Sequence, residues 1–435
     1  MKVETENPSP EFEKATYSKI TWRLMPFLFI CYMLAYMDRV NVGFAKLQMQ
    51  QDLRMSDSVY GLGAGIFFVS YFFFEVPANM ILQKVGARLW LGPIMILWGL
   101  ISSATLFVHS AASYYALRFA LGIAESGFFP GVILYLTFWY TRTHRARMVA
   151  TFMSAIPLSG VFAGPLSGWI LGRMSGVGQL RGWQWLFLIE GIPSAVAGIM
   201  AIFLLVDSPS KAKWLAPEER DLLLWRLHEE EEVKRREGEV RYRLMDAFRS
   251  GKVWLLCVVY FGMVMGNYGL QFWLPQTISD SLTKDPWHIG LISAIPWGLG
   301  AIAMILYGHH SDATGERRWH VGLAGIVGAL AFAASSLPGM SGTAAFVALT
   351  VAAITVLCAH ATFWALPTAL LSGTAAATGI AWVNSVGNLA GYVSSYVIGT
   401  IRDATGSMTL ALMALSSLCL ISGVIALRVA RQKQS

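Results

Sequence analysis

The sequence predicts an all-α membrane protein whose twelve transmembrane helices form two six-helix bundles related by an internal repeat. Three observations support this fold class. Hydrophobic residues make up 55% of the 435 positions and charged residues only 14%, which is typical of chains embedded in lipid. Twelve apolar segments are long enough to cross a bilayer, which takes about 20 residues. The two halves also share spaced residues, as parallel repeats of membrane proteins do.

The apolar segments divide into two sets of six. The first six lie near residues 22–44, 58–82, 88–108, 112–140, 150–172 and 183–206, and the second six near 253–275, 288–308, 319–337, 344–371, 380–401 and 406–428. The intervening stretch is polar, and Ser208-Pro209 and Ala216-Pro217 within it are helix-start signals. We therefore predict an N-terminal bundle (1–206), a cytoplasmic linker (207–252) and a C-terminal bundle (253–435).

Lysine and arginine predict the orientation. With a cytoplasmic N-terminus, the inner segments carry 25 of the 33 basic residues and the outer loops carry 6. This asymmetry places both termini in the cytoplasm. The net charge of +7 is then explained by topology, and no nucleic-acid partner is needed. Residues 1–19 are polar and the first apolar segment is too long for the core of a cleavable signal peptide, so we expect the chain to remain in the membrane.

The sequence carries no pattern typical of an enzyme or a receptor. It lacks a nucleophile with a base, a cluster of metal ligands and an extramembrane sensing domain. His309-His310 with Asp312 is the one metal-like group, and the repeat explains it better as a loop. The four cysteines all fall in apolar segments without CxxC spacing, which favours small buried side chains. We expect no disulfide, metal or cofactor, and a monomer in the lipid bilayer.

The repeated residues fall into two sets. The glycines common to both halves at an offset of 227 are Gly160, Gly164 and Gly172 with Gly387, Gly391 and Gly399. We expect these to pack helices closely. At an offset of 229, Asn79, Gln83, Gly86 and Arg88 align with Gly308, Asp312, Gly315 and Arg317.

This second set resembles the cytoplasmic gate motif of the major facilitator superfamily. The resemblance implies gate roles for Gln83, Gly86, Arg88, Asp312, Gly315 and Arg317. The first copy departs from the motif at two positions, with Asn79 where a glycine is usual and Gln83 where an aspartate is usual. The second copy keeps both its glycine and its acid.

Three further segments, residues 36–41 (YMDRVN), 118–125 (RFALGIAE) and 384–391 (NSVGNLAG), resemble the anion:cation symporter branch of that superfamily. Bacterial tartrate, sugar-acid and aromatic-acid permeases belong to this branch, as do sialin and the vesicular glutamate transporters. The resemblance implies proton-coupling roles for Asp38 and Glu125. It also implies substrate contacts for Tyr36, Tyr71, Trp364 and Asn384, although Trp364 is equally compatible with core packing.

The intramembrane charges indicate the chemistry independently of the resemblance. Arg39 and Arg118 both lie about 8 to 9 Å below the outer edge of their helices, and a guanidinium binds a carboxylate in bidentate fashion. We therefore expect an anion site, with the alternative that Arg39 only pairs with Asp38 and Arg118 only with Glu125. Glu125 lies about 10 Å deeper than Arg118 on nearly the same helix face.

We therefore expect a secondary transporter of a bacterial inner membrane that imports a small organic carboxylate, tartrate-like or sugar-acid-like, with protons by alternating access. Co-transported protons offset the ~2.3 kcal/mol per 100 mV that opposes the entry of each negative charge. Helix seven offers Asn267 and Gln271 as further substrate ligands. Two alternatives stay open: uptake of an aromatic acid such as hydroxyphenylacetate, and anion exchange, because residues 159–168 (SGVFAGPLSG) resemble a motif of superfamily antiporters.

Overall fold

The computed structural model describes residues 9–237, 249–370 and 375–429, and within these ranges every regular element is a helix. Eleven helical stretches of the described chain are long and apolar enough to cross a membrane. The twelfth expected span falls in α16 (Ala375–Thr405), which begins directly after the undescribed residues 371–374. The all-helical membrane fold is therefore as predicted.

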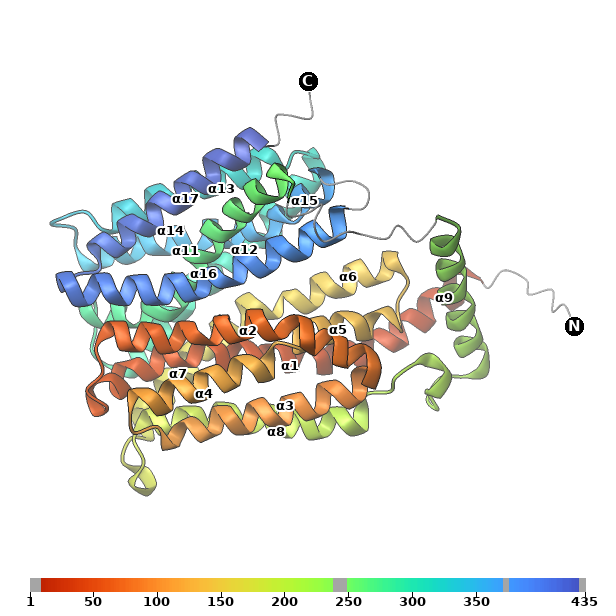
Figure 1. Cartoon of the computed structure of the whole chain (residues 1–435), viewed down its shortest axis with the longest axis horizontal. Coiled ribbons are helices and arrows are strands. Elements are labelled where there is room, and N and C mark those ends of the chain that lie inside the picture. Colours follow the sequence, from red (N-terminus) through yellow and green to blue (C-terminus); the bar gives the residue numbers. More distant parts are fainter. Residues whose placement is uncertain (1–8, 238–248, 371–374, 430–435) are drawn as a thin grey trace, which may run out of the picture.

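The helices of residues 10–204 lie together in the lower part of Figure 1 and are called the first group. They are α1 (Pro10–Asp52), α2 (Asp57–Val85), α3 (Ala87–Ala104), α4 (Ala111–Glu125), α5 (Phe128–Thr137), α6 (Arg142–Met153), α7 (Ala155–Arg173) and α8 (Gly182–Leu204), with the short 3₁₀ turns η1 (Thr105–Phe107) and η2 (Val177–Gln179) between them.

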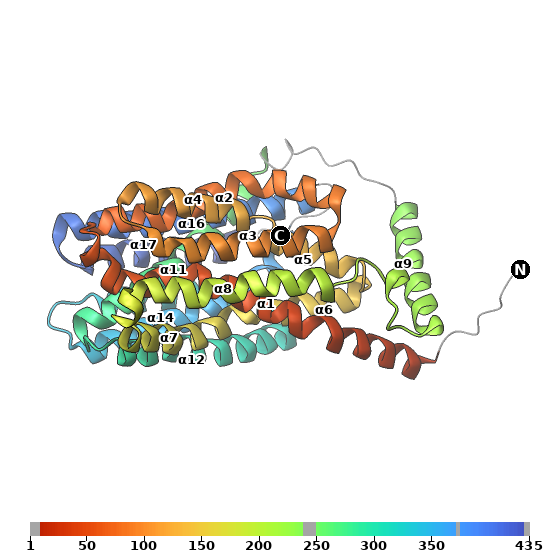
Figure 2. The same ribbon diagram turned by 90° about the horizontal axis from the view of Figure 1, so that it is seen from below.

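The second group lies in the upper part of the same view. It consists of α11 (Gly251–Ser281), α12 (Pro286–Thr314), α13 (Arg318–Ser335), α14 (Gly342–Phe363), α15 (Ala365–Leu370), α16 and α17 (Thr409–Val429). Most helices run along the long axis of the molecule, and α9 (Pro217–Glu237) lies across one end of it (Figures 1 and 2). We call this end the α9 end and the opposite one the far end.

Three of the expected spans are each broken into two helices. The breaks separate α4 from α5, α6 from α7 and α14 from α15, and they lie three or four residues before Pro130, Pro157 and Pro367. A proline lacks the N–H that would bond to the carbonyl four residues earlier, and its ring clashes with that carbonyl. Two predicted site residues lie at these breaks: Glu125 ends α4, and Trp364 is the C-cap of α14.

Helix α9 begins at the Ala216-Pro217 signal and is attached to the first group by ion pairs. The carboxylate of Glu219 lies 2.6 Å from Nζ of Lys19, and Nη2 of Arg226 lies 2.7 Å from a carboxylate oxygen of Glu13. Partial burial of Glu219 works in the opposite direction, but the hydrogen bonds from Lys19 and the backbone of Ala216 hold the pKa of this carboxyl below its usual range. The linker helix is therefore part of the first group.

Close contacts join the two groups near the far end. A Cβ added to Gly164 of α7 would lie 2.6 Å from the carbonyl oxygen of Gly290 in α12, and one added to Gly399 of α16 would lie 2.3 Å from the carbonyl oxygen of Asp57 in α2. Two of the repeated glycines therefore permit backbone contact between the groups, which is the packing role that the sequence predicts.

Candidate functional site

An ion pair between α1 and α4 is at the centre of the candidate site. Nη2 of Arg39 lies 2.9 Å from Oε2 of Glu125, and the two side chains are 12% and 1% exposed. Aromatic rings surround the guanidinium, with Cζ 5.1 Å from the ring centres of Tyr36 and Phe67 and 5.4 Å from that of Tyr71. The structure thus brings together four of the predicted site residues, with Phe67 as an addition.

Asp38 lies apart from this cluster, although it is the neighbour of Arg39 in the chain. Its carboxylate is buried and accepts hydrogen bonds from Nε1 of Trp98 (3.1 Å), Oγ of Ser102 (2.8 Å) and Oγ of Ser194 (2.6 Å). Asp38 therefore connects α1 to α3 and α8 inside the first group. Within the described chain no basic group lies within 4 Å of it, so the pairing of Arg39 with Asp38 that the sequence left open is not the one adopted.

Arg118 is buried against α2 and is only 1% exposed. Its Nη2 donates to the carbonyl oxygen of Ala64 at 3.4 Å, its Nε and Nη1 are buried without a hydrogen-bond partner, and its Cζ lies 5.1 Å from the ring centre of Phe67. Among the described residues it has no acid within 4 Å, so the alternative pairing with Glu125 is also not adopted. The two predicted arginines thus share contact with one ring but have different surroundings.

A cavity lies between the two groups and reaches the ring of Tyr36, beside Arg39. Its lining comes from α1, α7, α11 and α12 and consists of Tyr36, Val40, Phe44, Ile156, Ser159, Gly160, Ala163, Leu270, Gln271, Leu274, Pro275, Ser293 and Trp297. Gln271 therefore faces this cavity, whereas Asn267 is buried about one turn earlier in α11 and is not part of the lining. Of the two helix-seven candidates, the geometry favours Gln271.

The remaining predicted substrate contacts are on the second group. Trp364 packs against the ring of Tyr260 with centroids 4.8 Å apart, and the hydroxyl of Tyr260 lies 3.2 Å from Nε2 of His360. Asn384 is half-buried in α16. Neither Trp364 nor Asn384 is among the residues that line the cavity at Tyr36.

Comparison with known proteins identifies the family. The model of the Major Facilitator Superfamily matches residues 28–395. The chain belongs to the major facilitator superfamily. It is 47% identical to the putative metabolite transport protein NicT of Pseudomonas putida over 94% of this chain and 92% of that protein. It is 45% identical to a putative tartrate transporter of Agrobacterium vitis over 97% of this chain and 92% of that protein.

A solved structure shows the same fold. The bacterial homologue of the human lysosomal transporter Spinster, in an inward-facing and unoccupied conformation, aligns with a TM-score of 0.77 at 16% identity over 97% of this chain and 98% of that one. The superfamily resemblance drawn from the motifs is thus confirmed. The chain is a multi-pass membrane transporter and not an enzyme.

The two copies of the superfamily gate motif differ in the way the sequence suggests. In the second copy, Arg317 lies 2.5 Å from the carboxylate of Asp312, and Gly315 ends α12 with a φ of +66°. In the first copy, Gly86 also has a positive φ of +84°, but Nε of Arg88 donates to the carbonyl oxygen of Ile202 in α8 at 2.8 Å. Gln83 cannot supply the negative charge of an aspartate and is exposed.

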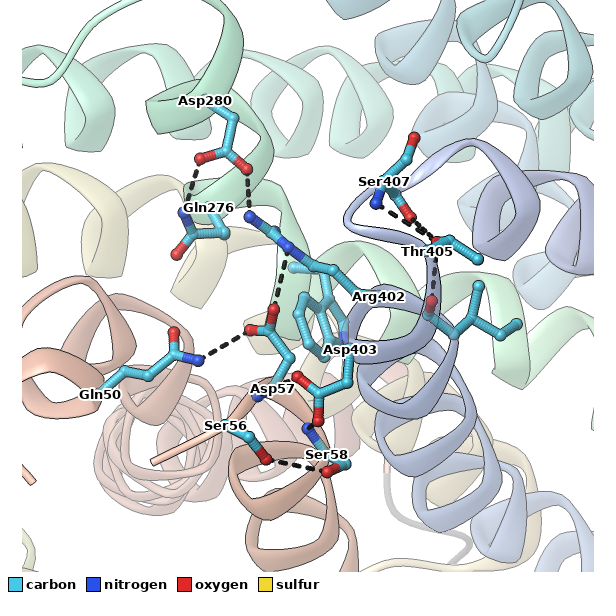
Figure 3. A network of polar contacts seen from close by, with 12 residues as sticks. Gln50, Ser56, Asp57, Ser58, Gln276, Asp280, Arg402, Asp403, Thr405 and Ser407 are labelled. Carbon is cyan, nitrogen blue, oxygen red and sulfur yellow. Dashed lines mark hydrogen bonds and ion pairs between the residues drawn. The ribbon is translucent and has the colours of Figure 1, made fainter. Parts of the chain in front are cut away.

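Ion pairs connect the two groups at the far end, and the sequence analysis did not anticipate them. Arg402 of α16 lies 3.1 Å from Asp57 of α2 and 2.5 Å from Asp280 of α11, as Figure 3 shows. The carboxylate of Asp403 accepts hydrogen bonds from the backbone N–H groups of Asp57 and Ser58, at 2.9 and 2.8 Å. An acid of the second group therefore caps the N-terminus of a first-group helix.

A buried lysine completes this far-end network. Nζ of Lys46 lies 2.7 Å from Asp57 and 4.1 Å from the ring centre of Trp273, and its side chain is fully buried. We use the name far-end network for Lys46, Asp57, Asp280, Arg402 and Asp403. Each of these residues reads from sequence as an ordinary charge beside an outer loop, so the signal available was only their position at the ends of apolar segments.

Sequence reasoning also missed the hydrogen-bond donors to Asp38 and the cavity residue Ser293. Ser102 and Ser194 lie in apolar segments near glycines, where small residues usually serve packing. Phe67 is one of 24 phenylalanines, and its contact with both arginines depends on how α2 is rotated about its axis. No residue pattern indicates that rotation.

Proposed function

We propose that this chain imports a small organic carboxylate together with protons across a bacterial inner membrane, with both termini in the cytoplasm. The names of the relatives support a small organic substrate, because one of them is a putative tartrate transporter. The distribution of basic residues supports the orientation. The observation that carries the proposal is the buried ion pair of Arg39 with Glu125 beside the cavity.

The ion pair allows a proton and a substrate carboxylate to bind together. When Glu125 takes up a proton, its negative charge is lost and Arg39 becomes available to another carboxylate. A substrate carboxylate then binds the guanidinium in the place of Glu125. When Glu125 releases the proton, it competes for Arg39 again and the substrate leaves. One proton thus accompanies one negative charge, which removes the penalty of the inside-negative potential.

Asp38 is the proposed second proton site. It is a buried carboxylate that three neutral donors hold, and intramembrane acids of this kind are typically part of a proton path. A proton on Asp38 would remove the charge that the donors on α3 and α8 stabilise. This links its protonation to the packing of α1 within the first group.

The far-end network and the glycine contacts support a conformational assignment. They hold the two groups together at the end that lies outside the cell in the proposed orientation. We therefore interpret this conformation as the inward-facing state of an alternating-access cycle. Opening towards the outside requires Arg402 to part from Asp57.

The variant Glu125→Gln tests the proposal, because glutamine mimics the protonated acid and cannot release a proton. In liposomes the variant should exchange labelled substrate by counterflow but should not accumulate it when an inward proton gradient is imposed. Glu190→Gln is the matched control, because Glu190 is also a buried acid but bonds to Ser167 at 2.9 Å rather than to an arginine.

Two outcomes would contradict the proposal. Gradient-driven accumulation at the wild-type level in Glu125→Gln would remove Glu125 from proton coupling. A wild-type protein that shows counterflow but never responds to a proton gradient would be an anion exchanger, which is the alternative that the sequence leaves open.

A further inference from the structure

The polar lining of the cavity beside Arg39 consists of a few neutral groups. Two of them are buried and lack a hydrogen-bond partner: Oε1 of Gln271 in α11 and Oγ of Ser293 in α12, whose residues are 7% and 2% exposed. Ser159 also lines the cavity, but its hydroxyl donates to the carbonyl oxygen of Ile156 at 2.6 Å. Buried polar groups normally have partners, so the two unpartnered atoms indicate a ligand that supplies them.

The cavity contains no charged lining residue. A carboxylate placed there would lose its hydration without gaining a cation, which is strongly unfavourable. A hydroxyl group avoids this loss, because it donates to the amide oxygen of Gln271 and accepts from the hydroxyl of Ser293. The remaining lining is mostly apolar, with Phe44, Leu274 and Trp297 among its members.

The position of Arg118 supports the same conclusion. A dicarboxylate would need a second cation at the distance of its second carboxylate, and Arg118 is the obvious candidate. Arg118 is instead buried between α4 and α2, donates to the carbonyl of Ala64 and does not line the cavity. Only Arg39 is placed next to the cavity, through its contact with the ring of Tyr36.

We propose that Gln271 and Ser293 form a second subsite that binds an uncharged hydroxyl of the substrate, so that the transported acid is a hydroxylated monocarboxylate with an apolar, ring-like middle. This inference rests on the proposed function, because Arg39 must hold the single carboxylate. It decides between the substrate classes that the sequence leaves open. A tartrate-like dianion has no second cation to bind here.

A matched pair of probes tests the proposal on the purified full-length protein. 4-Hydroxyphenylacetate and phenylacetate differ only in the hydroxyl, and their affinities are measured by calorimetry without a proton gradient, with tartrate alongside. The wild-type protein should bind the hydroxylated acid at least tenfold more tightly than phenylacetate. Ser293→Ala and Gln271→Leu should reduce this preference to about one while the affinity for phenylacetate stays within twofold. Retained phenylacetate binding also demonstrates that each variant is folded.

Ser159→Ala is the control, because its hydroxyl faces the same cavity but already has a partner, and the preference should be unchanged. The proposal is overturned if tartrate binds more tightly than the ring acids, or if Ser293→Ala and Gln271→Leu keep the wild-type preference. Those results leave proton-coupled carboxylate import intact. Failure of tartrate and of both ring acids to bind would count against the subsite and the proposed function together.

Discussion

Arg39 and Arg118 differ in their partners, and this difference should appear in their variants. Arg39→Lys should lower the affinity for the transported acid by tenfold or more, because an ammonium cannot reproduce the bidentate fork. Arg118→Lys should leave that affinity within about threefold but lower the melting temperature, since it removes the contact with Ala64 and the packing on Phe67. Calorimetry and thermal unfolding of the purified variants separate the two effects. Equal loss of affinity in both would mean that Arg118 also binds the substrate.

At the level of single residues, the sequence predicts which side chains matter but not how they pair. Asp38, Arg39, Arg118 and Glu125 stand out because charges are rare at membrane depth. Consecutive residues on a helix point about 100° apart, so Asp38 and Arg39 face different neighbours. The choice of Glu125 as the partner of Arg39 depends on the rotation of α1 against α4, which no local pattern encodes.

At the level of helices, the close contact of α7 with α12 gives a prediction about glycine. Gly290→Ala should destabilise the protein by about 1 to 3 kcal/mol and reduce uptake, because the added Cβ would lie 2.3 Å from the carbonyl oxygen of Gly164. Gly308→Ala in the same helix is the control, since a Cβ there meets nothing within 4 Å. Thermal unfolding and uptake of both variants provide the comparison. Equal stability of the two would show that the contact tolerates a methyl group.

The existence and order of the helices could be predicted from the apolar segments, but the three breaks could not. Pro130, Pro157 and Pro367 each follow a break, whereas Pro93 and Pro193 lie inside continuous helices. A proline removes one hydrogen bond wherever it occurs. Whether the helix then bends or ends depends on the packing around it, and this information is not local.

At the level of the whole molecule, the far-end network should control access from the outside. In Arg402→Gln, a cysteine introduced by Ser395→Cys should react faster with a membrane-impermeant thiol reagent added from outside, because Ser395 is fully buried beside α2 and the four native cysteines are buried. Arg181→Gln is the control, since its ion pair with Asp52 stays within the first group. Equal labelling in both backgrounds would contradict a latch at Arg402.

The attachment of α9 to the first group changes how far apart the two halves can move. The polar stretch predicted as a linker has 46 residues (207–252), but η3 (Pro209–Lys211) and α9 belong to the folded first group. Only residues 238–250 connect α9 to α11, and at full extension such a segment reaches about 45 Å. The chain therefore sets an upper limit on the separation of the end of α9 from the start of α11, and the ion pairs of α9 determine where that tether begins.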